Sequence, residues 1–460
     1  MFSNLQIENN KKALILLATA SSVLYFIFAY DLVRTDYPKL LLLYSTLFLL
    51  FYSLVNYNKT NIKLLTGLAF GFRALFIFAI PNLSQDFYRF IWDGRLLLEG
   101  YNPYLFNVAS FINNNEFPVA QAEELFKGMG KLNASHFTNY PPLNQLCFLI
   151  AALFAKTNIL GSVVVMRLII IAADFGTFYY GKQLLKVINK PVHNIFWYLL
   201  NPFIIIELTG NIHFEGVMIF FLIWSLYLLY KGHWILSAVT LGLSVSTKLI
   251  PLMFLPLLFQ LFMNRETSKT KGILKLTRYY SIVGLVIIIS FLPFTSSEFI
   301  NNYTQTVGLW FQRFEFNASL YYIARAIGYT FRGYNEIAII GKYIPVLVIL
   351  FVLIVTFFRN NKSIPLLISS MLFVLSFYYF AATTVHPWYI ATLLILSVFT
   401  TYKFPLIWSF VIILSYLAYS NTADQENLWI IASEYLIVYS AFTWEVILKK
   451  PLGIKKSAII

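Results

Sequence analysis

Long apolar runs recur along the whole sequence, and they constrain the fold more than any other feature. A bilayer core of ~30 Å needs about 20 apolar residues for one helix to cross it. Charged residues make up only 12% of the chain, whereas a soluble domain averages roughly a quarter. So few charges cannot cover a soluble surface, and the high apolar content also excludes a disordered chain. We therefore predict a polytopic membrane protein.

The apolar runs predict an all-α bundle of about 14 transmembrane helices, folded as one integral membrane domain over residues 1–460. The single cysteine, Cys147, excludes an intrachain disulfide and a cysteine-based zinc site. The spans are expected at 13–32, 40–56, 62–80, 160–180, 194–209, 215–230, 234–248, 249–263, 279–294, 338–358, 363–381, 388–401, 405–420 and 428–447.

The basic residues predict the orientation of these spans. Lys and Arg exceed Asp and Glu, giving a net charge of +14. With a cytoplasmic N-terminus, Lys11, Lys12 and the basic linker 264–278 lie inside with most other basic residues, as the positive-inside rule requires. The apolar stretch 143–155 is then a re-entrant or interfacial helix. Topology thus explains the basic excess without a nucleic-acid partner. The extracytoplasmic loops are 81–142 and 295–337.

The first of these loops contains the strongest candidate functional residues. Asp86, Arg89, Phe90 and Asp93 recur at i, i+3, i+4 and i+7, which predicts a helix over 86–98 with all four on one face. Two carboxylates, a guanidinium and aromatic rings would then lie together at the membrane surface. A solvated interfacial helix with an internal Asp86–Arg89 ion pair would produce the same spacing.

Helix-breaking residues and polar groups interrupt several spans near their outer ends. Proline removes a backbone donor and disfavours helix at the preceding residue. Ionisable groups at membrane depth are expensive, so they indicate a functional site or a buried pair. The interruptions are Asn139-Tyr140-Pro141-Pro142-Leu143, Asn201-Pro202-Phe203, Gly210-Asn211-Ile212-His213-Phe214-Glu215-Gly216 and Lys248-Leu249-Ile250-Pro251.

Taken in order, these pieces resemble the polyprenyl-phosphate-sugar-dependent glycosyltransferases of the GT-C superfamily, in particular the catalytic subunit of GPI mannosyltransferase I and its bacterial relatives. The resemblance covers 81–255 and resumes at 316–321 and 385–389. Its motifs are the acidic helix ending in Gly100-Tyr101-Asn102-Pro103-Tyr104, then Tyr140-Pro141-Pro142-Leu143, Ala173-Asp174, Leu200-Asn201-Pro202, Gly210-Asn211, and Lys248 with Pro251.

The resemblance implies an inverting transferase that moves a sugar, expected to be mannose, from a polyprenyl-phosphate donor to a hydroxyl of a lipid-linked or cell-envelope glycan. Loop 81–142 would be the catalytic loop, in a bacterial inner membrane with the active site facing outward. A carboxylate must accept the proton of the attacking hydroxyl, and we expect Asp86 to do so. Cations stabilise the departing phosphate, and Lys248, His386 and Arg313 are the candidates because each is expected at an outer helix end.

The resemblance also suggests residues that hold the acceptor or the sugar: Asp93, Arg89, Arg95, His213, Glu215 and Tyr389. Pairing of Arg89 with Asp93 alone would explain Asp93 and Arg95 as well. No metal is expected. The eukaryotic enzyme has an Asp-x-Asp motif, whereas this chain has Ser84-Gln85-Asp86 and retains only the second aspartate. His213 and Glu215 form a His-x-Glu pair that lacks further ligands.

Charged residues within the spans have a different interpretation. Arg73, Arg167 and Asp174 are expected to form a structural network between helices. Two other functions would also place charges and broken helices in a membrane: a transporter or lipid flippase, and an O-antigen-type polymerase. We find no related halves of the kind that a transporter shows. A small accessory subunit is a further possible partner.

Overall fold

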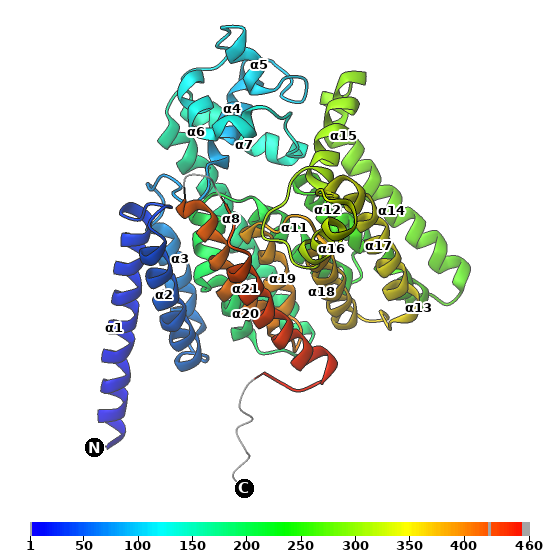
Figure 1. The fold of residues 1–460 in the computed structure, drawn as a ribbon. Coiled ribbons are helices and arrows are strands. Elements are labelled where there is room, and N and C mark those ends of the chain that lie inside the picture. The colour runs from blue at the N-terminus through cyan, green and yellow to red at the C-terminus, as the bar shows by residue number, and fades with distance from the viewer. Residues whose placement is uncertain (1, 422–424, 453–460) are drawn as a thin grey trace.

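Helices form the architecture of the part of the chain that the structure describes, as the sequence predicts (Figure 1). The computed structural model describes residues 2–421 and 425–452. Across these residues the one β-type pairing is an isolated parallel bridge between Phe316 and Thr384. The all-α class is therefore confirmed.

The N-terminal half begins with α1 (Phe2–Tyr30), α2 (Tyr37–Tyr57), α3 (Ile62–Ala74), α4 (Asp86–Leu98), α5 (Val108–Asn113), α6 (Ala122–Ala134), α7 (Pro142–Ala155) and α8 (Ile159–Val187). It continues with η1 (Val192–Ile195), α9 (Phe196–Leu199), α10 (Pro202–Ile204), η2 (Ile205–Gly210), α11 (Glu215–Tyr230) and α12 (Trp234–Thr247).

The C-terminal half comprises η3 (Ile250–Phe254), η4 (Pro256–Leu258), α13 (Phe259–Arg265), α14 (Lys269–Phe291), η5 (Leu292–Phe294), α15 (Ser297–Gln312), α16 (Leu320–Arg332) and α17 (Ile337–Phe358). The last elements are α18 (Ile364–Ala381), η6 (Pro387–Tyr389), α19 (Ile390–Val398), α20 (Phe404–Val411), η7 (Ile412–Ser420), α21 (Leu428–Phe442) and η8 (Thr443–Ile447).

Seven helices in the described part are long and apolar enough to cross a bilayer: α1, α2, α8, α14 with η5, α17, α18, and α21 with η8. An eighth span is possible if the pair Pro202–Gly210 and Glu215–Tyr230, bent by 114°, counts as one. Several expected spans are instead shorter or broken helices, including α12, α19 and α20. The membrane class is supported, and the count of about 14 stays a prediction.

The broken helices follow directly from local sequence. The expected span 194–209 divides at Asn201, whose side chain accepts a hydrogen bond from the Phe203 amide and caps the turn that Pro202 opens. A π-helical segment, η2, completes this short piece before the chain bends. Proline is tolerated at the start of a helix because its missing N–H would be unpaired there in any case.

Helices α4 to α7 form a separate layer above the bundle, at the same end as the turn between α1 and α2 (Figure 1). The helix expected over 86–98 is α4 itself. Phe90 of α4 stacks on Phe148 of α7, with ring centroids 4.7 Å apart. The other expected loop, 295–337, meets this layer through α15, where Asn302 donates to the Tyr104 carbonyl at 3.1 Å.

Two buried arginines hold the bundle beneath this layer. Arg73 of α3 pairs with Asp174 of α8, Nε to Oδ2 at 2.7 Å, and both side chains are fully buried. Arg167 of α8 instead donates to three backbone carbonyls, those of Ile77, Thr209 and Gly210, each at 2.8 Å. The expected structural network exists, but Arg167 and Asp174 have different partners in it.

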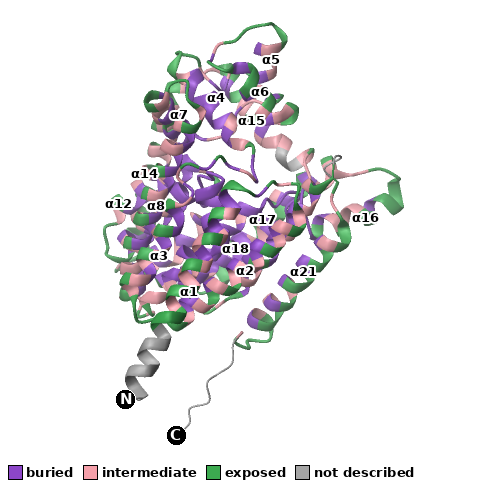
Figure 2. Ribbon diagram, turned by 90° about the vertical axis from the view of Figure 1, so that its left-hand side faces the viewer, coloured by how far each residue is buried: buried purple, intermediate pink, exposed green. Residues whose placement is uncertain are grey.

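The core runs through the middle of the bundle, where Figure 2 shows the buried residues concentrated. The α1–α2 hairpin packs against the C-terminal part of this core, because Tyr37 of α2 donates to the Leu414 carbonyl of η7 at 3.3 Å. Tyr44, about two turns further along α2, donates to the Ser409 carbonyl of α20. Elements from the N-terminal and C-terminal parts of the chain, α2 with α20 and η7, therefore pack against one another.

Gly94 allows α4 and α7 to pack closely, which gives a direct test of this layer. A Cβ at Gly94 would overlap the backbone carbonyl of Phe148, which cannot move as a flexible side chain could. We expect Gly94→Ala to lower the thermal midpoint of the purified protein by an amount equivalent to ~1–3 kcal/mol. Gly71→Ala is the matched control, because a Cβ there meets nothing within 4 Å. Equal midpoints for both variants would contradict the α4–α7 packing.

Candidate active site

One large cavity lies between the α4–α7 layer and the bundle. Its volume is about 880 Å³. Segments far apart in the sequence line it: the α1–α2 turn, the start of α4, the end of α6 and the loop before α7, the bend before α11, the end of α12, α15 with the loop after it, and η6 and η7. Its charged and imidazole-bearing lining residues are Arg34, Asp86, Arg89, Lys131, His136, His213, Glu215, Lys248, Glu315, His386 and Glu426.

Asp86 is the first residue of α4, and its carboxylate faces this cavity. It accepts only long hydrogen bonds, from Asn133 Nδ2 at 3.5 Å and from the Tyr140 hydroxyl at 3.4 Å. Burial raises the pKa of Asp86 to about 6, Glu215 adds to the rise, and Lys248 opposes it. The carboxylate is thus basic enough to take a proton and is not committed to a strong partner.

Arg89 pairs with Asp93 and not with Asp86. The Nε of Arg89 lies 2.8 Å from Oδ1 of Asp93, and both side chains are almost completely buried. The guanidinium also donates to the backbone carbonyls of Asn133 and His136, at 3.1 and 2.9 Å. Gln145 donates to the second oxygen of Asp93 at 3.1 Å. This pair therefore ties α4 to the loop before α7, and the solvated surface helix with an Asp86–Arg89 pair is not observed.

Lys248 and Glu215 form a second charge pair inside the cavity. Lys248 caps the C-terminus of α12 in extended backbone, and its ammonium donates to Oε1 of Glu215 at the start of α11. The ammonium also lies 5.4 Å from the ring centre of Tyr389. The other oxygen of Glu215 is buried without a hydrogen-bond partner among the described residues. The pair is therefore open to an incoming polar group.

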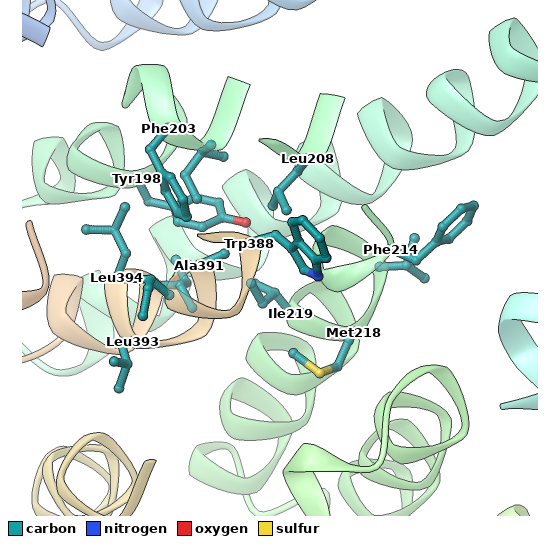
Figure 3. Packing of buried hydrophobic residues seen from close by; sticks show 14 of the residues in the cluster. Tyr198, Phe203, Leu208, Phe214, Met218, Ile219, Trp388, Ala391, Leu393 and Leu394 are labelled. Atoms are coloured by element: carbon teal, nitrogen blue, oxygen red, sulfur yellow. The ribbon is translucent and has the colours of Figure 1, made fainter. Parts of the chain in front are cut away.

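The bend between η2 and α11 builds the floor of the cavity. His213 stacks on Trp388 with ring centroids 3.8 Å apart, and His386 stacks on the same indole at 4.6 Å. Figure 3 shows Trp388 among the apolar side chains of the broken span and α19. Burial, with Lys248 adding to the effect, lowers the pKa of His386 to about 3. This imidazole is consequently neutral, and it can offer hydrogen bonds but not a positive charge.

The structure adds cavity residues that sequence reasoning did not identify. Glu315 and Glu426 line one wall, where Glu315 pairs with Arg325 and Glu426 accepts from the Tyr322 hydroxyl. Asn144 of α7 is fully buried, and neither its amide nitrogen nor its amide oxygen has a partner among the described residues. Asn144 and Gln145 directly follow the Tyr-Pro-Pro-Leu turn, and two polar residues at the start of an apolar helix could have indicated this part of the cavity.

Most of the expected site residues converge on this cavity. Three do not line it: Asp93 lies behind Arg89, Arg95 donates to the Ala120 carbonyl at 2.7 Å, and Arg313 is exposed at the end of α15. Those that do line it are Asp86, Arg89, His213, Glu215, Lys248, His386 and Tyr389.

No three His, Cys, Asp or Glu side chains gather in a metal-binding group within residues 2–421 and 425–452. His213 lies near Glu207, with Nε2 and Oε2 3.8 Å apart, and Glu207 accepts from the Tyr416 hydroxyl at 2.8 Å. The predicted absence of a metal from the reaction remains a prediction.

Comparison with known families gives a match over the N-terminal part of the chain. Residues 39–264 match the MptA/B family, described as alpha-(1->6)-mannopyranosyltransferase, N-terminal domain. This is a GT-C type mannosyltransferase family, so the resemblance inferred from the sequence is confirmed. The match supports transfer of a mannosyl group, and the segment contains Asp86, Arg89, Glu215 and Lys248. No curated protein matches the chain.

The two aspartates of α4 are expected to differ in their effect on stability. Asp93→Asn leaves the buried guanidinium of Arg89 without its carboxylate, and breaking a buried pair typically costs about 3–5 kcal/mol. Asp86→Asn removes a carboxylate that has only long hydrogen bonds, so the thermal midpoint should stay unchanged or rise slightly. Thermal unfolding of the two purified variants measures this. A destabilised Asp86→Asn variant with an unaffected Asp93→Asn variant would reverse the two roles.

Proposed function

We propose that this chain, a GT-C type mannosyltransferase over its matched segment, moves mannose from a polyprenyl-phosphate donor to a hydroxyl of a cell-envelope or lipid-linked glycan, with inversion at the anomeric carbon. One observation carries the proposal. A carboxylate with a raised pKa, Asp86, and a cation, Lys248, line the same cavity from different elements. An inverting transfer needs these two groups, because a proton is lost on one side of the sugar and a phosphate leaves on the other.

The reaction proceeds by direct displacement. The acceptor oxygen attacks the anomeric carbon, the bond from that carbon to the phosphate oxygen breaks, and polyprenyl phosphate leaves with the bonding electrons. The attacking hydroxyl is a very weak acid, so Asp86 takes its proton as the new glycosidic bond forms. The products are the extended glycan, polyprenyl phosphate and a protonated Asp86, which returns its proton to water.

The groups around Lys248 suit the leaving phosphate. Its ammonium offsets the charge that develops on the phosphate, and Glu215 holds it in place until the donor binds. The neutral His386 contributes a hydrogen bond rather than a charge. Arg313 lies away from the cavity lining, so we assign it no contact with the phosphate.

The remaining polar groups suit a sugar. Asn144 carries an unpaired buried amide that can bind two neighbouring hydroxyls. The Tyr389 hydroxyl and the His213 imidazole also line the cavity and can form further hydrogen bonds to a sugar. Arg89, Asp93 and Arg95 position the α4 helix and its loop. If the chain makes the α-(1→6) linkage of the matched family, inversion requires a β-linked mannosyl phosphate and an acceptor with a free primary hydroxyl.

Labelled polyprenyl-phosphate mannose tests the function directly, with membranes from expressing cells and Asp86→Asn as the key variant. Removal of a general base typically lowers the rate by 10²–10⁴-fold. Because Asp86 acts in its ionised form, kcat/KM of the wild type should fall below about pH 6 as the carboxylate becomes protonated, and the residual rate of Asp86→Asn should lack this limb. Transfer at the wild-type rate by Asp86→Asn would exclude the base role. Movement of intact donor lipid without transfer would indicate a flippase.

The orientation has its own test, in a Cys147→Ser background. We propose that the cavity faces outward, since the basic linker 264–278 is expected inside. Asn114 and Thr270 are both exposed, one near the α4–α7 layer and one at the start of α14. A membrane-impermeant thiol reagent should label Asn114→Cys in intact cells, and Thr270→Cys only after the cells are opened. The opposite pattern would place the active site in the cytoplasm.

A further inference from the structure

The α1–α2 hairpin contributes one residue, Arg34, to the lining of the cavity. It lies in the turn between α1 and α2, five residues before the family match begins at residue 39. Its guanidinium lines the same cavity as Asp86 and Lys248. The first two helices otherwise have no part in the chemistry described so far. Arg34 is therefore a cavity residue that the matched segment does not include.

A continuous stack of flat side chains holds Arg34 in position. The guanidinium lies 4.2 Å from the ring centre of Tyr419, and Tyr419 stacks on Phe316 at 5.8 Å. Phe316 stacks on His386 at 5.1 Å, and His386 stacks on Trp388 at 4.6 Å. All five side chains line the cavity. Stacking uses the face of a guanidinium and leaves the N–H groups in its plane available for hydrogen bonds.

The two other cations of the cavity that are not exposed are already neutralised. Arg89 is paired with Asp93, and Lys248 is paired with Glu215. Among the described residues, Arg34 has no carboxylate within ion-pair distance, and its one hydrogen bond is a long one of 3.4 Å to the Leu83 carbonyl. Lys131 also lines the cavity without such a partner, but it is exposed. Arg34 is thus a half-buried, oriented guanidinium with unused donors.

We propose that Arg34 binds the phosphate of the polyprenyl-phosphate donor, so that the α1–α2 hairpin completes the donor site. This inference rests on the proposed function and specifies which group recognises the anion. A guanidinium matches the spacing of two phosphate oxygens and binds them through paired hydrogen bonds. Because the stack fixes its orientation before the donor arrives, little side-chain freedom is lost on binding. The same contact serves the donor diester and the released polyprenyl phosphate.

Steady-state kinetics with separate donor and acceptor titrations test this assignment. For Arg34→Gln we expect the donor KM and the inhibition constant of added polyprenyl phosphate to rise together by about 10- to 100-fold, the usual effect of losing a charge-assisted contact. The acceptor KM should not change. Arg34→Lys should show a smaller rise, because it keeps the charge but loses the paired geometry. Lys39→Gln is the control: Lys39 lies on the same hairpin and pairs with Asp31 away from the cavity.

The outcomes separate this inference from the proposed function. Unchanged donor KM and inhibition constant in both Arg34 variants would overturn the phosphate assignment, and so would a rise in acceptor KM alone. If wild-type protein transfers no mannose from the donor, the proposed function fails, and direct binding of polyprenyl phosphate to purified wild type and Arg34→Gln still decides the phosphate site. If Arg34→Gln does not purify, Arg34→Lys with a donor KM equal to that of the wild type overturns the assignment.

Discussion

The bend between η2 and α11 is the feature on which the candidate active site depends. An open helix end within a bundle leaves backbone carbonyls unpaired, and in a membrane each such group costs several kcal/mol. Arg167 removes this cost at the bend, because it donates to the carbonyls of Thr209 and Gly210 and also to Ile77. The chain can then turn by 114° and place His213 and Glu215 in the cavity. A structural arginine outside the cavity thus makes the polar floor possible.

Two fully buried charge pairs form part of the scaffold around the cavity, and Asp86 lies outside both of them. Arg73 with Asp174 and Arg89 with Asp93 are buried pairs with short contacts. The first pair joins α3 to α8, and the second, within α4, is hydrogen-bonded to the segment before α7 and to Gln145 of α7. Asp86 has no such partner, and burial shifts its pKa toward the range where a carboxylate can accept a proton. This difference in pairing gives the two aspartates of α4, which are two turns apart, different parts: Asp93 is structural and Asp86 is the candidate base.

The sequence predicted those parts of the site that depend on local pattern. Helical spacing identified α4 with its observed bounds, and the outer breaks indicated Glu215 and Lys248 as cavity residues. It could not predict which carboxylate would pair with Arg89, because Asp86 and Asp93 stand at nearly equivalent helical spacings from it. The observed pair is accompanied by tertiary hydrogen bonds, from Gln145 to Asp93 and from Arg89 to the His136 carbonyl of the α6–α7 loop. Glu315 and Glu426 were missed for a related reason: their place in the cavity depends on contacts between distant segments.

The lining of the cavity also shows why the family match, which covers residues 39–264, does not describe a complete site. Asp86, Glu215 and Lys248 lie within residues 39–264, whereas Tyr419, Phe316, His386 and Trp388 come from the C-terminal half. Arg34 reaches this stack only because the C-terminal half packs against the α1–α2 hairpin, where Tyr37 and Tyr44 donate hydrogen bonds to the Leu414 and Ser409 carbonyls. The candidate base is therefore local to one helix, whereas the proposed environment of the leaving phosphate is a product of the tertiary fold.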